Sequence, residues 1–127
     1  MAELNVQLVA ADRAIWSGKA RMVIARTVDG DLGVLPGHAL LLAELADGVV
    51  TIRSTDGESV VAAVHGGFIS VDADGVSLLA ESAELAEEID VERARQALER
   101  ADADGGDGLS TAQRRAETRL LAAEARI

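Results

Sequence analysis

Residues 30–38 read Gly-Asp-Leu-Gly-Val-Leu-Pro-Gly-His, and this stretch decides how the sequence around it is interpreted. It places three glycines and the chain's only proline between apolar runs. Glycine permits positive φ or close approach of another backbone, whereas proline fixes φ and removes an amide donor. We therefore expect a surface loop whose shape is set by its backbone, with Gly33 and Gly37 as candidates for positive φ. We call residues 30–38 the glycine-proline loop.

On both sides of this loop, from Leu4 to Glu81, short apolar runs alternate with turn signals. Asp-Gly pairs mark the best turns, at 29–30, 47–48, 56–57 and 74–75. Several runs alternate in polarity, and Leu4, Val6, Leu8 and Ala10 share one face. This pattern predicts an antiparallel two-sheet sandwich or flattened barrel. Residues 40–45 and 60–64 are nearly continuous apolar runs, and their short length favours strands over helices.

After Glu81 the composition changes to Ala, Glu and Arg, which predicts helices over 90–103 and 109–126. We therefore divide the chain into a β-sandwich, 1–85, and a two-helix hairpin, 86–127. Asp90 suits the first helix's N-cap, and Ser110 with Gln113 forms a capping box for the second. The apolar positions of the helices are mostly alanines: Val91, Ala94, Ala97, Leu98 and Ala101, then Leu109, Ala112, Ala116, Leu120, Ala123 and Ile127. So little apolar area predicts a hairpin that is the least stable part of the fold and able to move.

Charge and composition exclude several classes of function. A formal net charge of -10 argues against nucleic acid as a partner. The chain has no cysteine and two histidines, so we expect no metal site, and no apolar run is long enough to insert into a membrane. The terminal helix is net basic, which leaves two interpretations open. Its arginines pair with local acids, or they form a docking face for an acidic partner.

No arrangement of residues predicts catalysis by the chain alone. It has no cysteine nucleophile, no serine in a nucleophile elbow and no phosphate-binding glycine motif. We interpret His38 as a loop residue and His65 as the end of a strand. Trp16 is either a core residue or an interface anchor.

Residues 30–42 resemble the GELGIxPGHxPLL signature of the epsilon subunit of the F-type rotary ATP synthase. The resemblance covers most of the chain. Residues 15–18 (Ile-Trp-Ser-Gly) are similar to a hydrophobic-aromatic-Ser-Gly step, and 66–71 (GGFISV) to the GGxLEV strand. Residues 76–84 (VSLLAESAE) resemble VTVLADTAE, and 89–94 (IDVERA) resemble the I/L-D-x-x-R-A motif. Such a protein has an N-terminal β-sandwich and a C-terminal helical hairpin.

The resemblance implies a non-catalytic rotor subunit at the foot of the central stalk. The sandwich would contact the gamma subunit and the ring of c subunits, with Asp31 facing the c ring and His38 lying toward gamma. Leu35 and Leu40 complete the implied interface. The hairpin would lie on the sandwich or extend toward the alpha/beta catalytic hexamer and inhibit ATP hydrolysis. The chain would then be peripheral, at the cytoplasmic face of the plasma membrane.

The helix-start motif also implies a regulatory ATP site in some family members. Carried over onto this chain, its residues are Glu84, Ile89, Asp90, Arg93, Ala94 and Arg100. Arg93 and Arg100 are two helical turns apart on one face, where both guanidinium groups suit phosphates. The alternative to a stalk subunit is a free-standing β-sandwich module that senses a nucleotide through this face. An exposed apolar surface around Leu35 and Leu40 favours the stalk subunit, and a closed polar sandwich favours the module.

Overall fold

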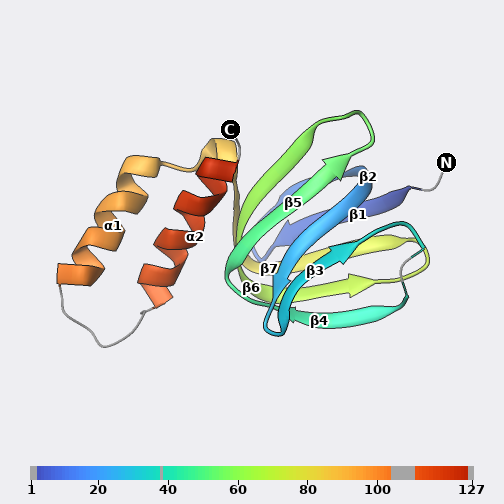
Figure 1. The fold of residues 1–127 in the computed structure, drawn as a ribbon, viewed down its shortest axis with the longest axis horizontal. Helices are drawn as coiled ribbons and strands as arrows, with labels where there is room; N and C mark the ends of the chain where they lie inside the picture. The colour runs from blue at the N-terminus through green and yellow to red at the C-terminus, as the bar shows by residue number, and fades with distance from the viewer. Residues whose placement is uncertain (1–2, 38, 104–110, 126–127) are drawn as a thin grey trace.

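The computed structural model describes residues 3–37, 39–103 and 111–125. In these ranges the chain forms seven strands and then a short 3-10 segment and two helices (Figure 1). The strands are β1 (Leu4–Ala10), β2 (Ala14–Thr27), β3 (Gly30–Val34), β4 (Leu41–Leu45), β5 (Gly48–Ser54), β6 (Ser59–Val71) and β7 (Gly75–Leu85). They are followed by η1 (Ala86–Glu88), α1 (Val91–Ala103) and α2 (Thr111–Ala125). The predicted fold class, a β-sandwich with a C-terminal helical hairpin, is confirmed.

The strands form two layers that share the two longest strands, β2 and β6. One layer pairs β4 with residues 67–71 of β6, then β7, β1 and the first half of β2. The other pairs β3 with the second half of β2, then β5 and residues 59–64 of β6. Neighbours are antiparallel except β1 and β7, which are parallel. The sequence-based expectation of an antiparallel sandwich missed this pair, because it joins the first and last strands of the sandwich.

Strand β6 changes layer at a double glycine. Gly66 and Gly67 have φ of +68° and +121°, and a Cβ on Gly67 would lie 2.0 Å from the carbonyl oxygen of Leu79. Only glycine fits such a close approach of two backbones. The expected strand at 60–64 therefore extends through this corner to Val71. His65, expected at a strand end, lies inside β6 and is fully buried.

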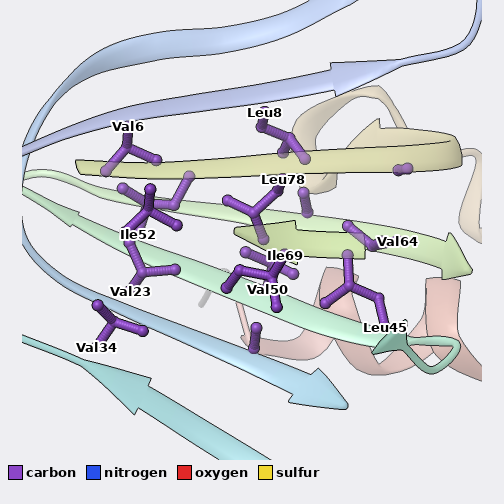
Figure 2. Close-up of a cluster of buried hydrophobic side chains, with 14 of the residues drawn as sticks. Val6, Leu8, Val23, Val34, Leu45, Val50, Ile52, Val64, Ile69 and Leu78 are labelled. Atoms are coloured by element: carbon purple, nitrogen blue, oxygen red, sulfur yellow. The ribbon is translucent and has the colours of Figure 1, made fainter. Parts of the chain in front are cut away.

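The core lies between the two layers (Figure 2). The face shared by Leu4, Val6, Leu8 and Ala10 is buried, as the alternation predicted. Trp16 is half-buried and packs against this core, which favours its interpretation as a core residue. The core side chains labelled in Figure 2 are Val6, Leu8, Val23, Val34, Leu45, Val50, Ile52, Val64, Ile69 and Leu78.

The helices lie on one side of the sandwich, with α2 between α1 and the strands (Figure 1). Ala122 of α2 packs in a second apolar cluster with Val61 and Ala63 of β6, together with Ala86 and Ile89. This position between two neighbours explains why Ala122 is buried although the single predicted stripe omitted it. The glycine link and the Ser110 cap lie outside the described residues.

Candidate functional site

A cavity of about 470 Å³ opens where the sandwich meets the helices. Four residues of the predicted nucleotide site line it: Glu84 from β7, Asp90 just before α1, and Arg93 and Ala94 from its first turn. The strand end, the helix start and α2 therefore converge on one site. We call it the hairpin cavity.

The start of α1 fixes the geometry of this site. The backbone N–H of Arg93 donates a hydrogen bond to Asp90 Oδ1 at 3.0 Å, and the N–H of Ala94 donates to the Asp90 carbonyl, also at 3.0 Å. Asp90 is thus the N-cap that the sequence predicts. The side chain of Arg93 is exposed and forms no ion pair with any residue whose side chain the structure describes. Its guanidinium is available to an anionic ligand.

Two carboxylates of the hairpin cavity are engaged by other arginines. Arg13, in the β1–β2 turn, donates from both terminal nitrogens to the two oxygens of Glu88 at 3.0 Å. These hydrogen bonds hold the pKa of Glu88 below its usual range and raise the pKa of Arg13. Glu84 accepts a hydrogen bond from Nε of Arg119 on α2. The α2 helix is thus attached to β7 at the wall of the cavity.

Two residues of the predicted nucleotide-binding site are not among the residues that line the cavity. Ile89 is buried in the apolar cluster with Ala122 and does not line the cavity. The side chain of Arg100 lies outside the described part of the structure. Sequence reasoning missed Glu88, Ala97 and Arg119 as lining residues. The basic character of the terminal helix was the one signal for Arg119, and it did not show which neighbour this arginine meets.

The residues predicted for the stalk and c-ring interface lie at the surface. Leu35 is 56% exposed and Leu40 77% exposed on either side of the loop's end, and Gly37 between them has a φ of +84°. The first five residues of the predicted loop, 30–34, form strand β3 instead. Gly33 lies in this strand and has no positive φ, so only one of the two candidate glycines has the expected conformation. Asp31 is exposed, with a carboxylate oxygen 3.8 Å from the Arg26 guanidinium. His38 lies outside the described residues.

The outer face of the β4–β6–β7 layer carries a further apolar surface that the sequence analysis did not identify. Leu42 of β4, Phe68 of β6 and Leu79 of β7 are all more than half exposed, and Phe68 lies opposite Leu79 in the strand register. A cavity of about 500 Å³ beside Phe68 and Leu79 is also lined by Val9. The leucines of this surface stand in runs of adjacent leucines, at 40–42 and 78–79. Such a run does not show which side chain faces outward, so the sequence analysis could not identify the surface.

Among the residues that the structure describes, no cluster of three or more His, Asp or Glu side chains is arranged to hold a metal ion. Within the same ranges, no helix has the length and apolar character needed to cross a membrane.

Comparisons with known proteins identify the family. Residues 3–86 match the family model described as the ATP synthase delta/epsilon chain, beta-sandwich domain. The chain is 62% identical over 125 residues to the ATP synthase epsilon chain of Streptomyces avermitilis, covering 98% of both chains. It is 54% identical over 110 residues to that of Rhodococcus opacus, covering 86% of this chain and 87% of the relative.

Solved structures show the same architecture. A chain in the Euglena gracilis mitochondrial ATP synthase structure, titled OSCP/F1/c-ring in rotational state 1, superposes with a TM-score of 0.77. It is 27% identical, and the match covers 98% of this chain and 81% of that one. A chain in the central stalk/c-ring structure of the Tetrahymena thermophila mitochondrial ATP synthase shares the fold, with a TM-score of 0.66 at 19% identity, covering 98% and 96% of the two chains.

A β-sandwich that carries a helical hairpin, and that matches ATP synthase chains over nearly its whole length, defines a structural subunit of that complex. Such a subunit belongs to the stalk and is not catalytic. The chain belongs to the ATP synthase epsilon chain family.

Proposed function

We propose that this epsilon chain turns with the central stalk and couples proton translocation to ATP synthesis by docking on the gamma subunit and the c ring. The observation that carries this proposal is the exposed apolar surface around the glycine-proline loop. Leu35 and Leu40 project from a loop whose form is set by Pro36 and Gly37, so little ordering entropy is lost on binding. The Leu42, Phe68 and Leu79 surface adds apolar area to the same interaction.

In this proposal the chain is peripheral, at the cytoplasmic face of the plasma membrane. Its membrane attachment comes through its partner subunits and not through insertion of its own helices.

The hairpin acts as a reversible brake on ATP hydrolysis. Small side chains hold α2 on the sandwich, chiefly Ala122 against Val61 and Ala63. Two ion pairs join α2 to β7, Arg119 with Glu84 and Arg115 with Glu81 at 3.8 Å. Such contacts are strong enough to hold a docked state and weak enough for a few kcal/mol to release it. Once released, the same arginines become available to acidic surfaces of the alpha/beta hexamer.

A regulatory ATP binds in the hairpin cavity and holds the hairpin down. Arg93 and Arg119 supply guanidinium groups for the phosphates, and Glu84, Asp90 and the backbone near Ala94 suit the base and ribose. Because Arg119 comes from α2 and Arg93 from α1, a ligand that contacts both stabilises only the docked arrangement.

Titration of a catalytic hexamer with its central stalk, lacking this subunit, tests the proposal. Binding and the ATP hydrolysis rate are recorded together for the full chain and for Leu35→Ser with Leu40→Ser. The control is Leu121→Ser, which alters a side chain as exposed as Leu35 but located on α2. We expect the native chain and the control to bind and the double variant to lose at least tenfold in affinity. Failure of the native chain to bind, or equal binding by the double variant, would contradict the docking proposal.

The brake is tested in the same titration with Glu81→Gln and Glu84→Gln combined. Removing both ion-pair partners frees α2 more often, so we expect stronger inhibition of hydrolysis at equal occupancy of the stalk. If the double variant inhibits no more than the native chain does, or if the native chain does not inhibit at all, the hairpin is not a brake and the chain acts only in coupling.

A further inference from the structure

His65 is a buried ionisable side chain with no role in the docking surface or the hairpin cavity. It is 0% exposed, and neither Nδ1 nor Nε2 has a hydrogen-bond partner within residues 3–37, 39–103 and 111–125. Strand alternation places it on the same face of β6 as Val61 and Ala63, the two residues against which Ala122 of α2 packs. The hairpin therefore covers His65 on the outer side of the sheet, and lifting α2 would return this imidazole to water.

The groups around His65 make a positive charge there unfavourable. Arg119 and Arg115 of α2 are the cations whose charges lower the pKa of His65, and Nε of Arg115 is buried without a hydrogen-bond partner among the residues that the structure describes. Asp47 in the β4–β5 turn and Glu84 on β7 act in the opposite direction. Both arginines already have carboxylate partners, since Arg119 pairs with Glu84 and Arg115 with Glu81. No carboxylate pairs directly with His65 among the residues that the structure describes.

Burial is the main reason why the pKa of His65 falls from 6.5 to about 4, and the charge of Arg119 lowers it further. The lowered pKa of His65 determines how the docking of α2 depends on pH. A docked hairpin with neutral His65 binds fewer protons than a released hairpin whose His65 titrates normally. Docking is therefore fully stable above pH 6.5 and weakens as the pH falls from 6.5 toward 4.

We propose that His65 couples the hairpin to proton concentration: α2 packs on the sandwich only over a neutral imidazole, and its release takes up one proton. The inference rests on the release of α2 proposed above, and it adds a chemical signal that shifts this equilibrium. Acidification favours the released hairpin, whereas ATP in the hairpin cavity favours the docked one. The two signals oppose each other through different residues.

The size of the effect follows from the two protonation equilibria. With 6.5 for the released imidazole and about 4 for the docked one, the opening constant rises about 20-fold between pH 7 and pH 5. The test is NMR-detected hydrogen exchange on the full chain at both pH values, corrected for intrinsic exchange rates. Amides of α2 report release of the hairpin, and amides of Ile52 and Ile69 in the core report global unfolding.

We expect the protection of α2 to fall about 20-fold from pH 7 to pH 5 in the native chain. His65→Gln keeps a polar side chain and His65→Leu removes it, and in both variants the change between the two pH values falls below about twofold. The control is Glu81→Gln, which takes the carboxylate partner from Arg115 and is not one of the charges that act on His65. It lowers the protection of α2 at both pH values but leaves the ratio between them near that of the native chain.

Two results would overturn the inference. In the first, α2 opens separately from the core, but its opening constant is the same at pH 7 and pH 5. His65 then does not couple release to protons, although the proposed release of the hairpin is retained. If α2 exchanges only together with Ile52 and Ile69, the hairpin does not open as a unit, and both proposals fail. An NMR titration of the His65 ring adds a direct check, because a normal pKa in a fully protected hairpin contradicts the coupling.

Discussion

Arg13 and Glu88 form a bidentate ion pair, in which each terminal guanidinium nitrogen lies 3.0 Å from one of the two carboxylate oxygens. The pair joins the β1–β2 turn to η1, across 75 residues of sequence. Glu88 also accepts the backbone N–H of Leu85 at 3.1 Å. The base of the hairpin is therefore fixed to the sandwich, and movement of the helices must begin after Glu88.

Replacing Arg13 with Gln should loosen this base. The expected result is faster hydrogen exchange at Ile89, whose N–H donates to the Ala86 carbonyl, with little change in the core. Because the pKa of Glu88 is lowered in the folded protein, the contribution of the pair is present at neutral pH and is lost as the pH falls through that pKa. Lys19→Gln is the control, since Lys19 pairs with Glu3 elsewhere on the surface. Equal exchange at Ile89 in both variants contradicts the assignment.

Gly67→Ala should destabilise the sandwich by about 3 kcal/mol or more, because the added Cβ meets the Leu79 carbonyl and φ is +121°. Gly57→Ala is the matched control. Gly57 also has positive φ, but nothing lies within 4 Å of its added Cβ, so the cost should be about 1 kcal/mol. Urea denaturation of the two variants measures the difference, and similar midpoints would show that the corner tolerates a side chain.

Leu78 and Leu79 are adjacent in β7 but face opposite ways. Leu78→Ala should cost about 2–5 kcal/mol of folding stability, since Leu78 is fully buried. Leu79→Ala should change stability by no more than about 0.5 kcal/mol, because its side chain is 55% exposed. In the stalk-binding assay, Leu79→Ala should weaken docking although the chain remains folded. Leu78→Ala should not weaken docking in this way. A folded Leu79→Ala chain with native affinity would remove this face from the proposed interface.

Gly37→Ala should weaken docking about fivefold, because alanine at a φ of +84° costs about 1 kcal/mol and reshapes the glycine-proline loop. Gly33→Ala should bind nearly as the native chain does. Its backbone is not in the left-handed region, and the added Cβ meets only the flexible methyl end of Met22, at 3.2 Å. Titration of the stalk with both variants distinguishes them, and equal affinities contradict a role for the shape of the loop at Gly37.

Arg93→Ala should weaken ATP binding at least tenfold without altering the unfolding midpoint, because a charge-assisted contact to phosphate is lost from an exposed side chain. Arg95→Ala is the control on the same helix. Arg95 pairs with Glu92 at 3.1 Å and does not line the hairpin cavity. Calorimetric titration measures both variants, and an unchanged Arg93→Ala isotherm rules out this phosphate contact.

The local elements and their order could be predicted from the amino-acid sequence alone. Period-two alternation placed Leu4, Val6, Leu8 and Ala10 on one buried face, and Asp90 capped α1 as its residue type predicts. Motif resemblance brought Glu84, Asp90, Arg93 and Ala94 into one predicted site, and the structure places these four around one cavity. These results were accessible because strand alternation, helix capping and motif spacing are local properties of the chain.

The contacts between residues far apart in the sequence could not be predicted in this way. The parallel pairing of β1 with β7, the Arg13–Glu88 pair and the contact of Arg119 with Glu84 join segments that no local pattern relates. The burial of His65 depends on α2 returning to cover β6, so the sequence offered no reason to remove it from a strand end. Packing of remote surfaces sets burial and partner choice, and both depend on how the whole chain closes on itself.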